Sequence, residues 1–337
     1  DLAENIISLQ PDIPVYRTKQ ILSWLYKSLI NDPDAMTNLP QQIKLLLKDN
    51  YSFFLPEVDA MVVSKDRSIK YRLRLEDGEL IESVLIPAAK KNTLCISTQV
   101  GCAHNCQFCS TGKMGFIRNL QSYEIVGQVI NAASYLKNNG SSHLTNLVFM
   151  GMGEPMDNLE NVLDALKMLQ SNEGLSISPR HITISTCGVV PGIISLANSG
   201  IKVKLALSLN SAIESKRKEL MPICKQYNLL ELKQALLYYQ RNSTYRVTIE
   251  YILFAGYNMG NEDLAALRKY IGDISCKINF IPFNVDGKSK FRAPTEAEIT
   301  DFMQRAQILP QAITLRKSRG SDILGACGQL ANSNQGD

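Results

Sequence analysis

The stretch Cys102-Ala103-His104-Asn105-Cys106-Gln107-Phe108-Cys109 decides how the rest of the chain is interpreted. Its spacing, C-x₃-C-x₂-C, follows a short strand predicted over 94–97 and a glycine at position 101. Three thiolates in one tight loop can each bind one iron of a 4Fe–4S cubane and leave the fourth iron open. Structural zinc sites and ferredoxin clusters use four protein ligands instead. We therefore expect Cys102, Cys106 and Cys109 to bind a 4Fe–4S cluster with one open iron.

Two interpretations without an iron–sulfur cluster also fit clustered cysteines. One is a zinc loop completed by a distant cysteine, and the other is a set of buried thiols without a ligand. No fourth cysteine lies nearby at a matching spacing, and His104 sits inside the loop, where it would reach the same metal poorly. The aromatic Phe108 directly before the last cysteine adds specificity, so the iron–sulfur interpretation is favoured.

Length and composition set broad limits on the chain. Its 337 residues, 45% of them apolar, allow one large domain and a small accessory domain. No run of about 18 apolar residues appears, so we predict no membrane span. Residues 1–5 lack the basic-then-apolar pattern of a secretory signal, so we expect a cytoplasmic protein. The net charge of +4 is compatible with a nucleic acid partner but does not require one. In this setting the eight cysteines indicate metal ligands or catalytic thiols more than a disulfide scaffold.

Segments of different periodicity follow one another along the chain. Residues 1–55 carry apolar side chains at helical spacing and form a predicted helical accessory domain. Residues 56–90 alternate polar and apolar side chains around an Asp77-Gly78 turn, which predicts a connecting β-hairpin. Residues 91–330 form the predicted core, which ends in a cysteine-containing loop, and residues 331–337 form a polar tail.

From residue 91 onward, apolar strands alternate with amphipathic helices. Such βα repeats predict an α/β fold with a parallel sheet, either open or closed into a barrel. Functional side chains then gather where the strands end. Strands are predicted over 94–97, 144–150, 181–186, 203–209, 246–253, 277–282 and 312–316, and helices over 123–137, 159–169, 193–198, 229–239, 263–271 and 296–307.

Glycines and polar residues stand at the ends of several predicted strands. In Gly151-Met152-Gly153-Glu154, the glycines would let backbone approach a ligand, and the carboxylate could bind an ammonium group or ribose hydroxyls. A simple tight turn would also explain the glycines. Ser185, the segment 208–210 and Asn284 also follow strands. They could present hydroxyls, amides or backbone to a cofactor, or they could merely cap the strand ends.

Two further cysteines stand apart from the cluster loop. Cys327 lies beside Gly328 in a loop, where a thiol would be accessible to a substrate. Three cations at 316, 317 and 319 precede it and could lower its pKa or meet RNA phosphate: Arg316, Lys317 and Arg319. Cys95 stands at the end of the strand before the cluster loop. From its sequence context alone, a core position is as plausible as a functional one.

Over nearly its whole length the chain resembles the RlmN/Cfr family of radical S-adenosylmethionine (SAM) RNA adenine methyltransferases. The stretches that carry the resemblance are 16–24, 95–115, 151–155, 185–191, 246–251 and 316–330. The resemblance implies a radical-SAM partial (β/α)₆ barrel with a small helical N-terminal domain and an open iron that chelates SAM. It also implies methylation of adenine in 23S rRNA and, for RlmN, in tRNA next to the anticodon.

The resemblance also implies roles for individual residues. Cys102, Cys106 and Cys109 match the cluster ligands, and the SAM-binding positions match Gly153, Glu154, Ser185, Ser208, Leu209, Asn210 and Asn284. Cys327 matches the cysteine that becomes S-methylated, Cys95 the second essential cysteine, and Glu82 the proton acceptor. From sequence alone, Glu82 would be an exposed strand carboxylate.

The implied mechanism uses two SAM molecules per turnover, because carbon 2 of adenine is not nucleophilic. One SAM methylates Cys327, and the second yields an adenosyl radical that removes hydrogen from that methyl group. The methylene radical adds to the ring, and Glu82 or Cys95 removes the ring proton. Cys95 then attacks the Cys327 sulfur, which releases the product and leaves a disulfide. The implied partners are 23S rRNA, tRNA, an electron donor such as flavodoxin and a thiol reductant, and the protein is expected to be a monomer.

Two positions depart from the family pattern. Asn210 stands where histidine is usual, and Asn284-Val285 stands where Asn-Pro is usual, so we expect altered SAM affinity and not lost function. Pro155 favours methylation of carbon 2, since the carbon 8 methylases tend to have alanine there. The alternatives are a Cfr-like carbon 8 methylase, a divergent paralogue with another RNA target, a radical-SAM enzyme that modifies peptides or small molecules, and a non-catalytic zinc or RNA-binding protein.

Overall fold

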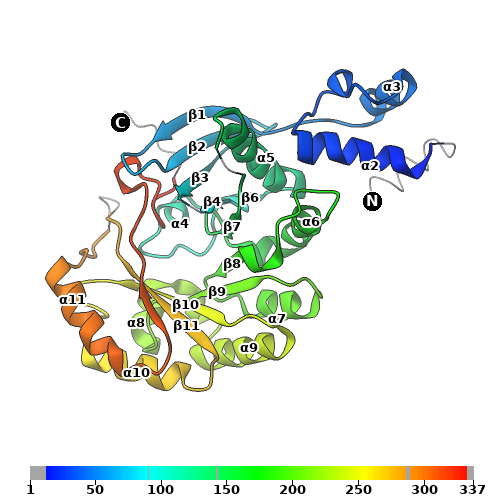
Figure 1. Cartoon of the computed structure of the whole chain (residues 1–337). Helices are drawn as coiled ribbons and strands as arrows, with labels where there is room; N and C mark the ends of the chain where they lie inside the picture. The colour runs from blue at the N-terminus through cyan, green and yellow to red at the C-terminus, as the bar shows by residue number, and fades with distance from the viewer. Residues whose placement is uncertain (1–12, 90, 142, 286–288, 332–337) are drawn as a thin grey trace.

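The computed structural model describes residues 13–89, 91–141, 143–285 and 289–331. Within them, ten strands form one mixed sheet in the order β1-β2-β3-β4-β7-β8-β9-β10-β11-β12 (Figure 1). Their bounds are β1 Glu57–Val63, β2 Ile69–Arg74, β3 Leu80–Ala88, β4 Lys91–Cys95, β7 Asn146–Phe149, β8 Ile182–Thr186, β9 Lys204–Ser208, β10 Val247–Leu253, β11 Cys276–Pro282 and β12 Ile313–Leu315. Two short strands, β5 Gln99–Gly101 and β6 Phe116–Asn119, pair with each other on either side of the cluster loop.

From β4 to β12 all neighbouring strands are parallel, as the alternating sequence pattern predicts. Parallel neighbours require crossover connections, and helices supply them here. In Figure 1, helices α5, α6, α7 and α9 lie along one side of these strands. The helices of this half are α5 Ser122–Asn138, α6 Leu159–Gln170, α7 Val190–Asn198, α8 Glu214–Leu220, α9 Leu229–Asn242, α10 Asn261–Ile271 and α11 Glu296–Arg305.

The observed elements differ from the predicted ones in detail. The strand predicted over 144–150 is observed only over Asn146–Phe149, because Met150 already leads into the glycine turn. The spacing of apolar residues in the sequence does not predict α8, because most of its seven residues are charged. Its Arg217 is buried all the same, and its guanidinium donates to the carbonyl oxygen of Cys187 at 2.7 Å. Short α4, Ser110–Met114, was also not predicted.

Three antiparallel strands extend the sheet beyond β4. The predicted hairpin is confirmed as β2 and β3, joined through Asp77 and Gly78, while β1 was not predicted. Strand β3 pairs with β4, and Val84 lies opposite Cys95 in that pairing. The hairpin therefore borders the strand that leads into the cluster loop, and it is more than a linker between two units.

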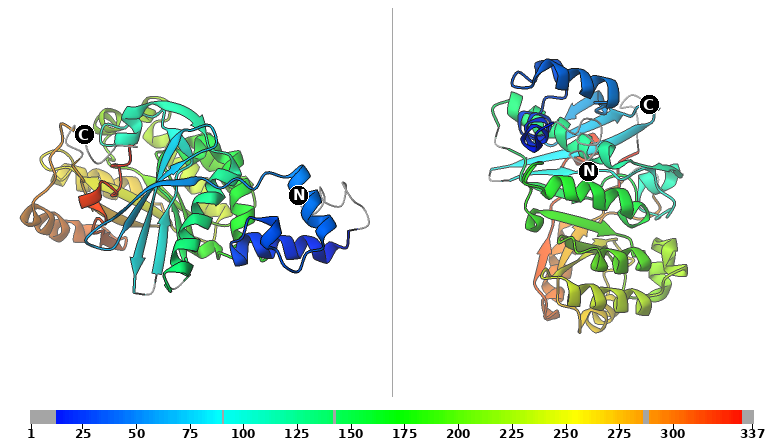
Figure 2. Two further views of the ribbon diagram at one scale, coloured as in Figure 1. Left: turned by 90° about the horizontal axis from the view of Figure 1, so that it is seen from above. Right: turned by 90° about the vertical axis from the view of Figure 1, so that its right-hand side faces the viewer.

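Two N-terminal helices, α2 Val15–Ser23 and α3 Gln41–Asn50, project from one end of the sheet (Figures 1 and 2). They share a separate apolar cluster made of Ile13, Ile21, Met36, Leu39, Ile43 and Leu47. A π-helical turn, Trp24–Ser28, follows α2, and the indole nitrogen of Trp24 donates to Asn38 Oδ1 at 2.6 Å. The helical prediction for this region is met from Val15 onward, and residues 1–12 lie outside the described part. None of the helices in the described part is long and apolar enough to cross a membrane.

Helix α5 packs closely against the start of the hairpin region. A Cβ atom on Gly127 would lie 2.4 Å from Pro56 Cδ, and the Asn131 side chain donates to Pro56 O at 2.7 Å. Glycine therefore occupies a helix interior because the proline ring occupies the space of a side chain.

We predict that Gly127→Ala lowers the free energy of unfolding by about 1 kcal/mol in urea titrations. Alanine gains about 1 kcal/mol in helix propensity over glycine, but overpacking against a stiff ring costs about 1–3 kcal/mol. Ser134→Ala, at a half-buried position of the same helix, is the matched control and should be neutral or slightly stabilising. A Gly127→Ala variant as stable as this control would show that the Pro56 contact is not tight.

Candidate active site

A cavity lies at the carboxyl ends of the parallel strands, where the sequence predicts the functional residues to gather. The cluster loop forms one part of its wall and the Cys327 loop another. The predicted site residues that line it are Cys102, Cys106, Cys109, Gly153, Glu154, Ser185, Ser208, Asn210 and Cys327. The strand ends therefore bring together side chains that are more than two hundred positions apart in the sequence.

Backbone hydrogen bonds fold the cluster loop against its flanks. The Cys102 amide donates to the Gly115 carbonyl at 2.8 Å, and the Cys109 amide donates to the Cys106 carbonyl at 3.0 Å. A Cβ on Gly112 would approach the Cys106 nitrogen to 3.1 Å, so α4 must pass close behind the loop. All three thiols line the cavity as a result.

The three thiols are costly to ionise without a cation. Burial raises the pKa of Cys102 to about 12, and it raises the pKa of Cys106 and Cys109 as well. Repulsion from the neighbouring thiols adds to the rise for Cys106. A bound metal centre would reverse this cost, because thiolates are stabilised by coordination.

The arrangement suits a cluster better than a single ion. In the described part of the chain, no three His, Cys, Asp or Glu side chains converge on one point as ligands of one ion. A cubane takes one thiolate for each iron, so its ligands need not converge. His104, considered as a fourth ligand, instead places Nε2 2.6 Å from Asp157 Oδ2.

Glu154 lies at the centre of the strand-end constellation and is only 4% exposed. Its Oε2 accepts from the Cys187 amide at 2.7 Å, and its Oε1 accepts from the Met156 amide at 3.1 Å. Burial raises the pKa of Glu154, and the hydrogen bond from Cys187 opposes the rise. A buried carboxylate held this way gains most from a cationic partner such as an ammonium group.

The neighbouring glycine allows this placement of Glu154. Gly153 has φ +95°, and a Cβ on it would lie 2.5 Å from the Gln99 Cβ. The Gln99 side chain also accepts from the Glu154 amide at 2.8 Å. Any larger residue at 153 would push the turn away from β5.

The other residues predicted to contact the cofactor differ in whether their side chains line the cavity. Ser185 and Ser208 line the cavity directly. Asn210 also lines the cavity. Its backbone is in the left-handed conformation, with φ +57°, which asparagine tolerates better than most residues. Its Oδ1 accepts from the Ile252 amide at 2.9 Å, and its Nδ2 contacts Met221 Sδ at 3.3 Å, so the amide is turned toward protein partners. Leu209 is buried and does not line the cavity.

Asn284 lies in a neighbouring cavity instead of the one described above. Its Nδ2 donates to the Cys327 carbonyl at 3.3 Å. The structure therefore places Asn284 as a support of the Cys327 loop.

Cys95 and Cys327 meet at this neighbouring cavity, which both residues line. Cys327 also lines the first cavity and so stands between the two. Both thiols are free, Cys95 being buried and Cys327 half-buried. Burial, and then the nearby Cys327, raise the pKa of Cys95 to about 12.

Arg316 is half-buried beside this thiol pair. It lines the cavity of Cys95 and Cys327, and its Nη1 lies 3.7 Å from Glu250 Oε1. Interaction with Cys327 is the largest influence that raises the pKa of Arg316. Of the three cations predicted to meet RNA phosphate, only Lys317 and Arg319 are fully exposed.

Glu82 is fully buried, contrary to the exposed position that its sequence context alone would favour. Its Oε1 lies 3.1 Å from Lys70 Nζ, and its Oε2 accepts from the Ala331 amide at 3.0 Å. Glu82 lines neither cavity. The segment that follows Cys327 separates it from them.

Sequence reasoning missed several residues of the site. Glu250 is a buried carboxylate in the apolar strand β10, and a charge inside such a run is a signal that could have revealed it. Cys187 lines the first cavity beside Glu154, but its isolated position gave no sign of this. Arg217 supports Cys187 from α8, an element that the pattern does not predict.

We predict that an alkylating reagent at pH 8 modifies Cys327 well before Cys95, as measured by mass spectrometry of the peptides. With a pKa of about 12, only ~10⁻⁴ of Cys95 is thiolate at pH 8, and this fraction rises about tenfold for each pH unit. Cys276, also buried with its pKa raised to about 12, is the internal control and should be equally protected. Labelling of Cys95 at the rate of Cys327 would contradict the described burial.

Comparison with known proteins agrees with this geometry. Residues 96–269 match the model of the radical SAM superfamily, and residues 9–52 match the ribosomal RNA large subunit methyltransferase N-terminal domain. A crystal structure of a radical SAM methyltransferase from Sphaerobacter thermophilus superposes with a TM-score of 0.92 at 38% identity, covering 98% of this chain and 96% of that one.

Two curated relatives extend the similarity along nearly the whole chain. The dual-specificity RNA methyltransferase RlmN of Desulfotalea psychrophila is 42% identical over 94% of this chain and 89% of its own length. The protein of the same name from Lawsonia intracellularis is 42% identical over 97% of this chain and 93% of its own length. The chain therefore belongs to the radical SAM superfamily and, within it, to the RlmN family of methyltransferases.

Proposed function

We propose that the protein is a radical-SAM RNA methyltransferase that methylates carbon 2 of adenine in 23S rRNA and in tRNA next to the anticodon. The observation that carries the proposal is the cavity that Cys95 and Cys327 share, directly beside the cavity of the three cluster cysteines. A radical-SAM enzyme that modifies a peptide or small molecule has no need of this second thiol pair. The RNA substrate is suggested by the names of the relatives.

The residues of the first cavity fit both implied cofactors. Cys102, Cys106 and Cys109 would hold a 4Fe–4S cluster. Glu154 would bind the SAM ammonium group, with Ser185 and Ser208 beside it on neighbouring strand ends. When bound, the cluster and SAM supply an adenosyl radical that can remove hydrogen from an unactivated methyl group.

Cys327 would act first, as a nucleophile and carrier. Its thiolate attacks the methyl carbon of a first SAM, so that a sulfur–methyl bond forms while the methyl–sulfonium bond breaks. Arg316 lines the same cavity as Cys327, so its guanidinium would stand beside the reacting sulfur. After a hydrogen atom is removed with a second SAM, the methylene on Cys327 adds to carbon 2 of the adenine.

Cys95 would act last. Once the adduct had given up its ring proton and one electron, which the cluster would accept, the Cys95 thiolate would attack the Cys327 sulfur. The carbon–sulfur bond would then break, the released methylene carbon would take up a proton to become the methyl group, and a Cys95–Cys327 disulfide would remain. A thiol reductant then restores both thiols. Either Cys95 or Glu82 would take the ring proton, and Glu82 would require displacement of the Ala331 amide that now contacts its carboxylate.

We also propose which carbon of adenine is methylated, how the protein receives electrons and how its domains divide. A Cfr-like carbon 8 methylase is the second candidate, and Pro155, which lines the cofactor cavity, favours carbon 2. We propose a cytoplasmic monomer that receives electrons from a donor such as flavodoxin. Residues 1–55 would form its accessory RNA-binding domain, 56–90 the connecting hairpin, 91–330 the core and 331–337 the tail.

The variant Cys95→Ala tests the chemistry most sharply. It should accept the methyl group and form the carbon–carbon bond, but it has no thiol to break the thioether. We expect RNA to remain covalently attached to Cys327, seen on denaturing gels as a slow band that nuclease removes. The matched control is Cys276→Ala, which removes a buried thiol outside both cavities and should turn over normally.

If the Cys95→Ala variant methylates RNA at the rate of the Cys276→Ala variant, Cys95 is only a core residue. A double variant Cys95→Ala with Cys327→Ala should give no band, because the carrier sulfur is gone. A band that survives in this double variant would place the covalent link on another residue and would contradict the assigned role of Cys327.

A further inference from the structure

On one face of the parallel sheet, polar side chains near the start of several strands are exposed or half-exposed, while Ala206, Thr248 and Glu250 on the same face are buried. Along β8, Ile182 and Ile184 are buried against helices, while Thr183 between them is half-exposed. Along β9 and β11 the same alternation leaves Lys204 half-exposed and Lys277 exposed between buried neighbours. Because side chains alternate along a strand, these residues share one face with Ser185, Ser208 and Ile281 of the cavities. This inner face therefore runs from the active site toward the start of the strands.

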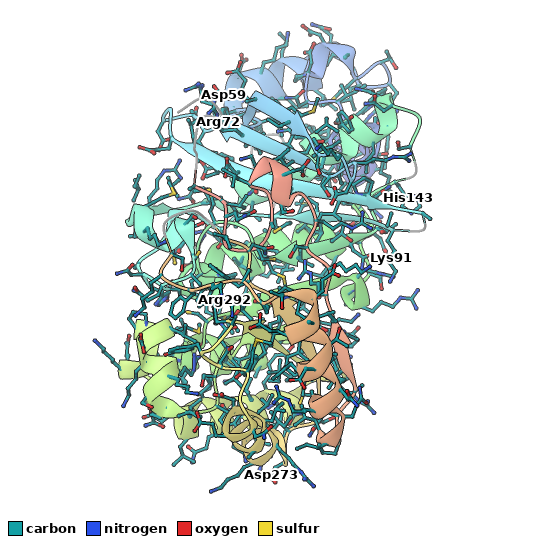
Figure 3. The ribbon with its side chains drawn as sticks, turned by 90° about the vertical axis from the view of Figure 1, so that its left-hand side faces the viewer. Asp59, Arg72, Lys91, His143, Asp273 and Arg292 are labelled. Atoms are coloured by element: carbon teal, nitrogen blue, oxygen red, sulfur yellow. The ribbon has the colours of Figure 1, made fainter. Side chains whose placement is uncertain are left out.

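The inner face is rich in cations at the end away from the cluster. Burial lowers the pKa of Lys204, and the charges of Lys277, Lys91 and Arg180 lower it further. Burial, and then the charges of Arg180, Lys204 and Lys91, likewise lower the pKa of His181. These groups therefore lie near enough to repel one another. Figure 3 shows Lys91 at the edge of the ribbon on the same side as His143, whose carbonyl accepts from Asn92.

Little in the described part of the chain neutralises this cationic group, which consists of Lys91, Arg180, His181, Lys204 and Lys277. Among the residues that the structure describes, no ion pair joins any of its members to a carboxylate. Arg180 Nε contacts His181 Nε2 at 3.2 Å, and Asn146 contacts His181 Nδ1 at 3.2 Å. Uncompensated cations that repel one another are stabilised when an anion binds.

Glu250 links the cationic group to the thiol pair, because one cation from each side acts on it. Arg316 and then Lys277 lower the pKa of Glu250, acting against burial, which is the largest influence and raises it. Glu250 lies 3.7 Å from Arg316, and Arg316 lines the cavity of Cys95 and Cys327. Between them stand neutral groups such as Asn279, whose Oδ1 contacts the Thr314 hydroxyl. A chain of phosphates that leaves the cavity along this face would pass the buried Glu250 carboxylate, whose charge Arg316 offsets, and would then meet amide, hydroxyl and lysine donors.

We propose that this inner face binds the sugar–phosphate backbone of the RNA next to the target adenine, with Lys277, Lys204 and Lys91 contacting successive parts of it. The proposal rests on the proposed function and adds the path of the substrate. Lysines with interspersed threonine and asparagine side chains are the groups that contact phosphate and sugar without reading bases. RNA is the better match because its backbone is an extended polyanion that can reach from the active site to Lys91 at the start of β4. An acidic electron donor bound at Lys91 would instead sit at the end of the strand opposite to the cluster loop.

Salt-dependent RNA binding tests this path. We compare the wild type with Lys91→Gln/Lys204→Gln/Lys277→Gln, using fluorescence anisotropy of a labelled tRNA transcript over a range of NaCl concentrations. The matched control, Lys225→Gln/Arg241→Gln/Lys269→Gln, removes three exposed cations next to or within the helices of the other face. Each lost phosphate contact should reduce the slope of log K against log salt by about 0.7–1. We expect a slope lower by about two or more and tRNA affinity weaker by roughly tenfold or more in the first variant only.

The design separates this proposal from the proposed function. Methylation of tRNA by the wild type tests the function, whereas the slope tests the path. The charge-preserving Lys91→Arg/Lys204→Arg/Lys277→Arg should keep the wild-type slope, which excludes a mere folding defect. A glutamine variant with the slope of the control overturns the proposal. Unchanged tRNA binding combined with slower reduction of the cluster by flavodoxin also overturns it, since the face would then serve an acidic protein.

Discussion

The docking of the Cys327 loop onto the cluster loop is the contact on which the arrangement of the site depends. The Ser110 amide donates to the Gly328 carbonyl at 2.7 Å, and the Thr111 hydroxyl donates to the Leu330 carbonyl at 2.6 Å. Gly328 has φ +84°, and a Cβ on it would lie 3.0 Å from the Phe108 carbonyl oxygen. A side chain at this position would be strained by the positive φ and would press on the Phe108 carbonyl, so glycine suits the close approach of the two loops. The Cys327 thiol is thereby held beside the three cysteines of the cluster loop.

Buried charge gives this docked arrangement its specificity. Glu82 and Lys70 form a pair in which both side chains are almost wholly buried, and the Ala331 amide supplies a further partner for the carboxylate. Leaving such a carboxylate without partners would cost several kcal/mol, so the end of the Cys327 loop is held where it satisfies Glu82. Arg316 and Glu250 form a second, looser pair on the other side of the thiols. Lys70, Glu82 and Glu250 belong to strands of one sheet, and Arg316 directly follows its last strand, β12.

Local patterns predict the framework of the molecule well. The alternation of strands and helices and the Asp77-Gly78 hairpin each depend on a few neighbouring residues, and the described structure contains both. The cysteine spacing is equally local, and the cluster that it predicts stays a prediction. The family resemblance also names Cys95 and Cys327, and the structure places both on one cavity. Their roles in chemistry stay predictions until they are tested.

Contacts between distant segments could not be predicted in this way. The burial of Glu82 depends on Lys70 and on a backbone amide 249 positions later, and no local pattern encodes that pairing. Asn284 has a strand-end position that suggested a cofactor contact, but its amide donates to the Cys327 carbonyl. Arg316 looked like a surface cation in sequence because its inward orientation depends on Glu250, a residue of another strand. In each case tertiary packing decides what a polar side chain contacts.

The central claim is that Cys327 carries the methyl group before it reaches RNA. Mass spectrometry of the peptide that contains Cys327, from protein purified with its cluster intact, tests this most directly. The account predicts the mass of one added methyl group on Cys327 and no added mass on Cys95 or Cys276. An unmodified Cys327 with the methyl group on any other cysteine would contradict the account.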